Sequence, residues 1–297
     1  MITQRLHPQC ISCLLEKNLK NIPDSFTNAQ KSEYMQGVLK IIGNAALGMS
    51  APEIVGEIRE FKESFGEAFD YCEIKDYFNR FMLSLEKGIE GKIEDSSNPL
   101  KTAVKYAMVG NFIDFGAMES VDEQKLKNTL ENIDEIVIDD TEYEQFESEI
   151  IKAENIAYLT DNCGEIVLDK LLIKQILKLN NSVKINVIVR GKPVLNDCTI
   201  DDAKQVGMGE IVSVIGNGTS IAGTVLNKIS AESKAIIDNA DLIISKGQGN
   251  FETLHGCGKN IYYLFLCKCK MFADRFGVES FKGIFVNDRN LLNFIDD

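Results

Sequence analysis

Apolar residues recur every three or four positions through the first hundred residues, which is the spacing of amphipathic α-helices. Residues 10–20 have this pattern, and so do residues 27–47. Ser50 followed by Pro52 is typical of a helix start, with Ser50 as the N-cap. The polar loop at residues 91–100 is the predicted boundary between a helical domain, residues 1–95, and a second domain, residues 96–297.

The spacing changes in the second part of the chain, where short runs of β-branched residues alternate with helix-like segments. Helices are predicted between most of these runs, for example at residues 165–179 and 223–239. Alternating strands and helices favour an α/β fold with a mainly parallel sheet. The predicted strands are residues 135–138, 156–160, 183–189, 211–215, 242–245, 261–266 and 284–286.

Composition and charge narrow the class of protein. The 297 residues are 44% hydrophobic and 26% charged, as in globular proteins, and no apolar run approaches the roughly 18 residues that span a bilayer. Because the N-terminus lacks the hydrophobic segment of a secretory signal, we expect a cytoplasmic protein with eight reduced cysteines. The net charge of −13 argues against a nucleic-acid partner, although much of it lies in an acidic segment at residues 119–154.

Four successive predicted strands are each followed by a polar loop that contains glycine. In an open parallel sheet, ligands bind beyond the carboxyl ends of the strands, so these loops are expected to form a site. A single Asp or Asn after a strand is commonly a helix cap or a turn residue, but a cap does not require this combination. The loops are Asp161-Asn162-Cys163-Gly164-Glu165, the segment at residues 191–199, Gly216-Asn217-Gly218-Thr219-Ser220, and Lys246-Gly247-Gln248-Gly249-Asn250.

The residue types in these loops fit a metal ion and a phosphate group. Asp161, Asn162 and Asp197 offer carboxylate and amide oxygens, which hard cations such as Mg²⁺ and Mn²⁺ prefer. Lys246 directly follows an apolar strand and provides a positive charge for phosphate. Glycine loops at helix N-termini add backbone N–H donors for the same anion.

A further segment, residues 98–116, is expected to contribute a substrate clamp. Asn111 and Asp114 are three positions apart, so on a helical turn they would share one face. The alternative is a helix stop at Gly110 followed by an Asx turn. Together, the predicted substrate-binding residues are Asn111, Asp114, Lys246, Gly247 and Asn250.

Four segments of the sequence stand out: GNFIDFG at residues 110–116, LTDNCGEIVLD at 159–169, VRGKPVLNDCTIDDA at 189–203 and DLIISKGQGNFETL at 241–254. Together they resemble the DUF89 family of metal-dependent damage-control phosphatases. They occur in the family's order, and the likeness covers nearly the whole chain. It is greatest to the stand-alone archaeal and bacterial branch that carries an N-terminal Cys-x-x-Cys. One departure is Cys163, which stands where alanine is common in the family.

The resemblance implies a fold and a metal site. The fold would be a three-layer α/β/α sandwich with a mainly parallel sheet and a helical N-terminal part. The catalytic site would hold a divalent metal (Mn²⁺, Mg²⁺, Co²⁺ or Ni²⁺) at Asp161, Asn162 and Asp197.

The same resemblance implies a reaction. It places Asn111 and Asp114 at the substrate and Lys246 on the substrate's phosphate. The expected activity is hydrolysis of small phosphomonoesters, namely sugar phosphates or damaged phosphorylated metabolites, with no nucleic-acid or membrane partner. An S-adenosylmethionine-dependent carboxyl methyltransferase is the alternative activity claimed within the family.

Two other enzyme classes match parts of the sequence. Asp139 and Asp140 follow a predicted strand, as the aspartyl nucleophile of HAD-type phosphatases does, but that chemistry requires Asp-x-Asp spacing. Gly216-Asn217-Gly218 follows a later strand, and it is shorter than the G-x-G-x-x-G fingerprint of a nucleotide- or S-adenosylmethionine-binding Rossmann enzyme.

The cysteines form a candidate second metal site. Cys10 and Cys13 make a Cys-x-x-Cys pair, which is half of a zinc site, and Cys72 is the predicted third ligand. Cys267 and Cys269 are further candidates, and the alternative is that these thiols pack as small hydrophobic groups. A metal held only by cysteines would make the protein a non-catalytic regulator rather than an enzyme.

Overall fold

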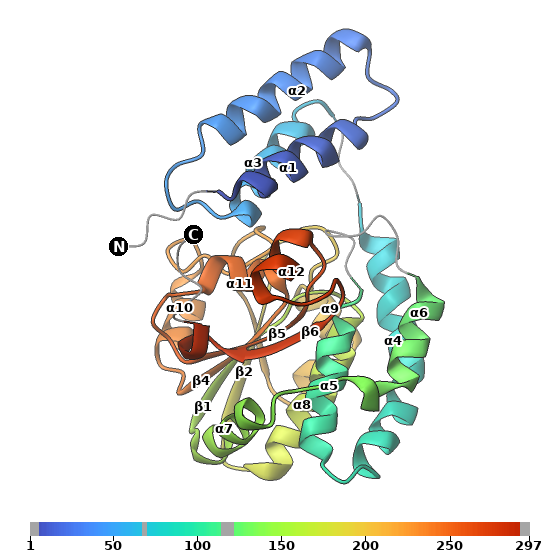
Figure 1. Ribbon diagram of the computed structural model, residues 1–297, viewed down its shortest axis with the longest axis vertical. Coiled ribbons are helices and arrows are strands. Elements are labelled where there is room, and N and C mark those ends of the chain that lie inside the picture. Colours follow the sequence, from blue (N-terminus) through green and yellow to red (C-terminus); the bar gives the residue numbers. More distant parts are fainter. Residues whose placement is uncertain (1–5, 67–69, 114–121, 292–297) are drawn as a thin grey trace.

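A six-stranded sheet forms the centre of the protein in a computed structural model that describes residues 6–66, 70–113 and 122–291 (Figure 1). The strand order is β3-β2-β1-β4-β5-β6. The first five strands are parallel, and β6 pairs with β5 in the antiparallel direction. The predicted α/β fold with a mainly parallel sheet is confirmed. The strands are β1 (Asn155–Leu159), β2 (Lys184–Val189), β3 (Ser213–Gly216), β4 (Leu242–Lys246), β5 (Ile261–Leu266) and β6 (Gly283–Asn287).

Helices precede the sheet and connect its strands. None of the helices in the described residues is both long and apolar enough to cross a membrane. The α-helices are α1 (Pro8–Lys20), α2 (Asn28–Gly43), α3 (Ala51–Glu63), α4 (Cys72–Glu94), α5 (Pro99–Gly110), α6 (Glu123–Glu131), α7 (Asp140–Lys152), α8 (Glu165–Leu179), α9 (Ile200–Gln205), α10 (Ala231–Asp238), α11 (Gln248–Leu254) and α12 (Lys270–Phe276). The short 3₁₀ helices are η1 (Ile133–Glu135), η2 (Met208–Glu210) and η3 (Asp288–Leu291).

Each face of the sheet is covered by helices, because successive side chains of a strand point to opposite faces. Tyr158 and Ile244 face a hydrophobic cluster that includes residues of α4, α5, α7 and α8. Leu159 and Ile243 face a second cluster that includes residues of α10, α11 and α12. The three-layer α/β/α sandwich is therefore present.

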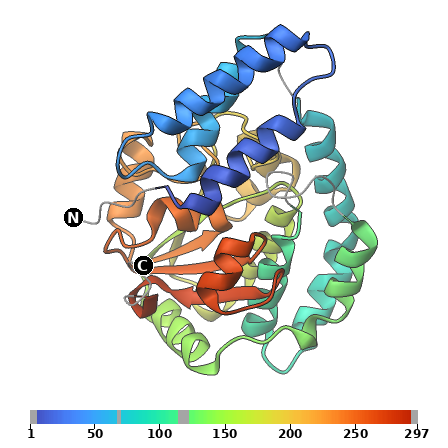
Figure 2. The same ribbon diagram turned by 45° about the horizontal axis from the view of Figure 1, so that its top comes forward.

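The first three helices have a hydrophobic cluster of their own, in which Tyr34, Val38 and Ile54 are buried. In contrast, Phe78 and Met82 of α4 belong to the hydrophobic cluster that Tyr158 and Ile244 of the sheet face. Figures 1 and 2 show α1–α3 (blue) as a group at one end of the molecule. The predicted division into domains at residue 95 stays a prediction, and the hydrophobic clusters group α4 with the sheet.

Two expected elements differ from the structure. The strand predicted at residues 135–138 is absent, because Glu135 ends the 3₁₀ helix η1 and residues 136–138 are unpaired coil. Asp139 then caps α7 by accepting a hydrogen bond from the Glu142 backbone N–H at 3.0 Å. The helix predicted at residues 223–239 is only α10, which begins where the Ser230 hydroxyl accepts a hydrogen bond from the Ser233 N–H at 3.2 Å.

Helix α3 contacts the loops at the carboxyl ends of the sheet. It begins with the predicted cap, in which the Ser50 N–H donates to the Glu53 carboxylate at 2.9 Å. Arg59 donates to the Pro193 carbonyl at 3.0 Å, in the loop after β2. Glu53 forms an ion pair of 2.7 Å with Lys228, in the segment after β3. The helical N-terminal part therefore lies against one of the loops that sequence analysis singled out, and against the segment that follows another.

The loops after β2 and β3 approach so closely that they contact through backbone atoms. A β-carbon at Gly191 would lie 2.1 Å from the Gly218 backbone nitrogen. Gly191→Ala should therefore force the loops apart and lower the free energy of unfolding by about 1–3 kcal/mol, measured by urea denaturation. Gly209→Ala is the control, because its added methyl group would meet no atom within 4 Å. Equal stability of both variants would contradict the close approach.

Glu252 of α11 faces α1, and burial raises its pKa to about 7 against the opposing effect of Lys17. The folded protein therefore retains this proton between pH 4.5 and 7 where the unfolded chain releases it, so stability falls as the pH rises through this range. Glu252→Gln should lose less stability than the wild type between pH 5 and 8 in urea denaturation. Glu57→Gln, on the exposed side of α3, should behave like the wild type. A steeper loss in Glu252→Gln would contradict the assignment.

Candidate active site

Two of the predicted loops meet at the centre of the sheet. The chain runs outward from β1 to β2 and β3, and then returns to β4 on the other side of β1. In sheets of this order, ligands bind in the crevice at the point where the direction reverses. Asp161 lies two residues beyond β1 and Lys246 ends β4, so both residues lie at this point.

The structure brings Asp161, Asn162 and Asp197 together from two neighbouring strand ends. Asn162 forms an isolated β-bridge with Asp197, and the Cys198 N–H donates to the Asp161 carbonyl at 2.8 Å. The Asn162 side-chain amide donates to Asp161 Oδ2 at 2.8 Å. All three side chains are buried, and Asp161 is the most exposed at 7%. The three predicted metal ligands therefore form one cluster.

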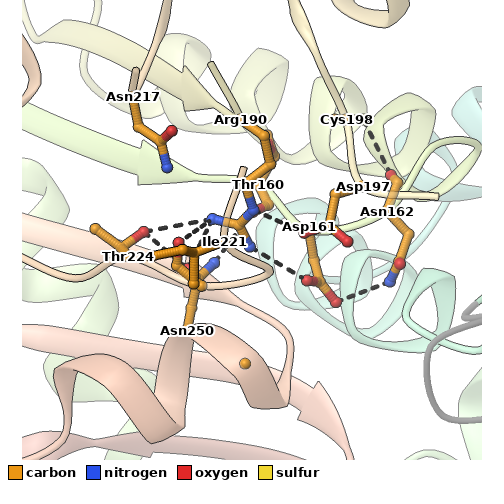
Figure 3. A network of polar contacts seen from close by, with 12 residues as sticks. Thr160, Asp161, Asn162, Arg190, Asp197, Cys198, Asn217, Ile221, Thr224 and Asn250 are labelled. Atoms are coloured by element: carbon orange, nitrogen blue, oxygen red, sulfur yellow. Dashed lines mark hydrogen bonds and ion pairs between the residues drawn. The ribbon is translucent and has the colours of Figure 1, made fainter. Parts of the chain in front are cut away.

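Arg190, which the sequence analysis did not select, contacts both aspartates from one side (Figure 3). Its Nε donates to Asp197 Oδ2 at 2.7 Å, and its Nη2 lies 3.5 Å from Asp161 Oδ1. Its Nη1 donates to Asn250 Oδ1 at 3.0 Å and to the Gly223 carbonyl at 3.1 Å. The side chain is 1% exposed. Arg190 directly follows the apolar strand β2, and Lys246 was selected in the sequence because of a similar position. The same signal could therefore have identified Arg190.

Asn111 contacts the cluster from the C-terminal end of α5. Its side-chain amide donates to Asp161 Oδ2 at 2.9 Å and to Glu165 Oε2 at 3.1 Å. Its carbonyl oxygen accepts a hydrogen bond from the Leu266 N–H at 3.2 Å. Asn111 therefore holds the carboxylate of Asp161, one of the predicted metal ligands, by a hydrogen bond. Asp114, its predicted partner at the substrate, lies outside the described residues.

Lys246 is fully buried, and its ammonium group has three acceptors. It donates to the Ala107 carbonyl at 2.7 Å, to Asp169 Oδ1 at 2.8 Å and to Glu165. Although burial acts to lower the pKa of Lys246, the two carboxylates raise it above its usual range. Burial raises the pKa of Asp169 to about 6, so both partners are charged at neutral pH. In this arrangement all three ammonium N–H groups are used within the protein.

Gly247 and Asn250 hold the loop after β4 against the cluster. Gly247 has a φ of 80°, and a β-carbon there would lie 2.0 Å from Asp161 Oδ2. Asn250 donates to the Thr160 carbonyl at 3.1 Å and to the Lys246 carbonyl at 2.8 Å. The side-chain oxygen of Asn250 accepts a hydrogen bond from Arg190. Asn250 therefore connects Arg190 to the backbone at the ends of β1 and β4.

The buried cluster carries an excess of negative charge. It contains four carboxylates and two cations, so two negative charges are uncompensated within it. Buried charges are costly unless they are paired, which makes the cluster suitable for a divalent cation. The Asn162 amide nitrogen is occupied, and its Oδ1 receives no hydrogen bond from the described residues. The charged residues of the cluster are Asp161, Glu165, Asp169, Asp197, Arg190 and Lys246.

The predicted thiol site is not assembled in the same way. Burial is the main cause that raises the pKa of Cys10 to about 12. Glu252 and Cys269, which lie near this thiol, raise it further. Cys72 is exposed at the start of α4, where Asp70 raises its pKa. The structure therefore does not bring Cys72 to Cys10 and Cys13. In the described part of the chain, no group of three or more His, Cys, Asp and Glu side chains is placed to hold a metal.

Comparison with known proteins identifies the family. The model of the damage-control phosphatase ARMT1-like domain matches residues 6–283. The chain belongs to this family, which includes the DUF89 proteins. The DUF89 resemblance seen in the sequence is therefore confirmed.

Relatives of this damage-control phosphatase family are found in archaea. Damage-control phosphatase PH1575 of Pyrococcus horikoshii is 40% identical over 235 residues, which are 76% of this chain and 79% of that protein. A damage-control phosphatase of Archaeoglobus fulgidus is 32% identical over 92% of this chain and 96% of its own length. An uncharacterised protein of Methanocaldococcus jannaschii is 30% identical over 93% of each chain.

A solved structure supports the same conclusion. The crystal structure of the DUF89 protein PH1575 superposes with a TM-score of 0.79 and 26% identity, covering 96% of this chain and 99% of that chain. The names of the relatives support a phosphatase at the level of the family.

The contact between Gly247 and Asp161 can be tested with a matched pair of glycines in this family member. Gly247 and Gly258 have nearly equal φ values of 80° and 79°, but only at Gly247 would a β-carbon meet other atoms within 4 Å. In both alanine variants, backbone strain should lower the free energy of unfolding by about 1–2 kcal/mol. Gly247→Ala should also displace the Asp161 carboxylate and lower phosphatase activity at least about tenfold. Equal activity in the two variants would show that the site tolerates the methyl group.

Proposed function

We propose that this protein is a divalent-metal-dependent phosphatase that hydrolyses small phosphomonoesters. The main support is the buried cluster in which two carboxylates and an amide from two strand ends meet, and in which four carboxylates share two cations. Asp161, Asn162 and Asp197 would hold the metal, which would be Mn²⁺, Mg²⁺, Co²⁺ or Ni²⁺. Oxygen ligands from Asp and Asn suit these ions.

The metal, when bound, would supply positive charge for the phosphoryl oxygens and would lower the pKa of a bound water. The protein's own residues orient the ligands. Asn111 and Asn162 donate to the same Asp161 oxygen, which fixes that carboxylate in one position. Arg190 fixes Asp197 from the other side. Burial of these groups limits water around them, which strengthens the electrostatic attraction of the carboxylates for a bound cation.

The substrate class follows from the groups around the site. The cluster is small, buried and acidic overall, and it lacks the basic, aromatic-lined groove of a single-strand nucleic-acid binder. We infer that the substrates are small sugar phosphates or damaged phosphorylated metabolites, in line with the damage-control names of the relatives. A cytoplasmic location is part of the same proposal.

The glycines of the loop after β3 have a structural explanation that requires no nucleotide or S-adenosylmethionine. The Gly218 backbone packs against Gly191. The side-chain oxygen of Asn217 accepts hydrogen bonds from the Gly191 and Thr219 N–H groups. Nothing in this packing favours the methyltransferase alternative over the phosphatase.

The proposal is tested by replacing the ligands one at a time. Asp161→Asn and Asp197→Asn should each lower metal-dependent release of phosphate from a phosphomonoester at least about 100-fold, because each removes a charged ligand. Asp201→Asn should retain activity, since this nearby side chain is 94% exposed.

The assays should compare Mn²⁺, Mg²⁺, Co²⁺ and Ni²⁺ on a panel of sugar phosphates, nucleotides and an aryl phosphate. Near-wild-type turnover in either site variant would rule out the proposed ligand set. Methyl transfer from S-adenosylmethionine, without any metal-dependent release of phosphate, would favour the methyltransferase instead.

A further inference from the structure

We propose that Arg190 is a positioning residue, which holds Asp161 and Asp197 in the arrangement that lets both carboxylates bind one divalent cation. This inference rests on the proposed function and assigns a role to a residue that the metal-ligand set does not include. It is supported by the contacts of the guanidinium group, which connect the segments that follow β1, β2, β3 and β4.

The guanidinium makes contacts on two opposite sides. On one side, Nε donates to Asp197 Oδ2 at 2.7 Å and Nη2 lies 3.5 Å from Asp161 Oδ1. On the other side, Nη1 donates to Asn250 Oδ1 at 3.0 Å and to the Gly223 carbonyl at 3.1 Å. Arg190 itself follows β2, Asp161 follows β1, Gly223 follows β3 and Asn250 follows β4. One rigid planar group therefore fixes the relative positions of four loops (Figure 3).

The anchor of this group is itself fixed. The Asn250 amide nitrogen donates to the Thr160 and Lys246 carbonyls, at 3.1 and 2.8 Å. Its carbonyl oxygen also accepts a hydrogen bond from the Thr224 hydroxyl at 2.8 Å. A chain of contacts thus leads from the backbone at the ends of β1 and β4, through Asn250, to Arg190 and the two aspartates.

Charge explains why such a group is needed. Asp161 and Asp197 are both buried, and two like charges in one site repel each other unless a cation lies nearby. Arg190 attracts both. A carboxylate has two oxygens with about four lone-pair sites, so one that accepts from Arg190 can also bind a metal. Arg190 therefore can remain in place when a cation binds.

The role depends on the shape of the guanidinium as well as on its charge. Nε and the two Nη atoms reach partners on opposite sides of a planar group, which spans a wider distance than a compact ammonium group does. Lys246 is the second buried cation of the cluster, but its three N–H groups are directed to Ala107, Asp169 and Glu165. It does not replace Arg190 between the two aspartates.

The test is the affinity for Mn²⁺, measured by titration calorimetry without substrate on the full chain. Arg190→Lys should weaken Mn²⁺ binding about 10–100-fold, and Arg190→Gln at least as much, because both lose the bridge. At saturating Mn²⁺, Arg190→Lys should lower kcat and change KM less than threefold. Arg59→Lys is the matched control, because Arg59 contacts the Pro193 carbonyl and not the aspartates.

Several outcomes would overturn the inference. Mn²⁺ affinity of Arg190→Lys within twofold of the wild type would show that the bridge is not needed. Equal weakening in Arg59→Lys would show a general effect of the substitution. Should the Arg190 variants not fold, Thr224→Val decides, because it removes only the hydroxyl that donates to Asn250 at 2.8 Å and accepts from Arg190 Nη1 at 3.4 Å. A threefold or greater loss of Mn²⁺ affinity in that variant would support the inference, and unchanged affinity would overturn it.

This test is separate from that of the proposed function. If Asp161→Asn and Asp197→Asn lose Mn²⁺ binding but Arg190→Lys keeps it, only the role of Arg190 is wrong. If the aspartate variants bind Mn²⁺ as the wild type does, the proposed metal site itself is wrong.

Discussion

Ionised groups that are removed from water need partners of opposite charge, and the loops at the carboxyl ends of the sheet are arranged around this requirement. Arg190 and Lys246 each lie against two carboxylates. The amides of Asn111 and Asn162 join the two groups by donating to a carboxylate of each. Removing one partner from a buried ion pair typically costs about 3–5 kcal/mol, so the cluster restrains the loops strongly.

The fold provides this cluster from elements far apart in the sequence. Asn111 comes from the end of α5, and Glu165 from the first turn of α8. Helix α4 supports the same turn, because Asn79 accepts a hydrogen bond from the Gly164 N–H at 2.6 Å. The helical layer on this face therefore does more than cover the hydrophobic side of the sheet, since it also fixes the side chains beside Asp161.

Strand periodicity predicted much of this arrangement from the sequence. Because parallel strands end at one edge, Asp161, Asn162 and Asp197 could be expected to meet without knowledge of their distances. The partners of Lys246 could not be predicted, because Glu165 and Asp169 lie on a buried helix face whose contacts depend on how α8 packs.

Arg190 was missed for a related reason. Its position at a strand end could be seen in the sequence, but its orientation toward two carboxylates could not. The segment at residues 223–230 was expected to be part of one helix over residues 223–239. Its backbone instead bonds to neighbouring segments: the Thr224 N–H donates to the Thr253 hydroxyl of α11 at 2.9 Å, and the Ser230 N–H donates to the Asn217 backbone carbonyl at 2.9 Å. Local propensity does not encode such tertiary contacts.

The backbone contact between Gly191 and Gly218 has a consequence for how this site can diversify. Loops at strand ends are the usual places where α/β proteins acquire insertions and new specificities. Here the loops after β2 and β3 lie too close for a side chain between them, so neither can change alone at this point. Grafting one loop from a relative with a different sequence would require grafting the other with it. Variation in substrate choice is therefore expected at positions away from this pair of glycines.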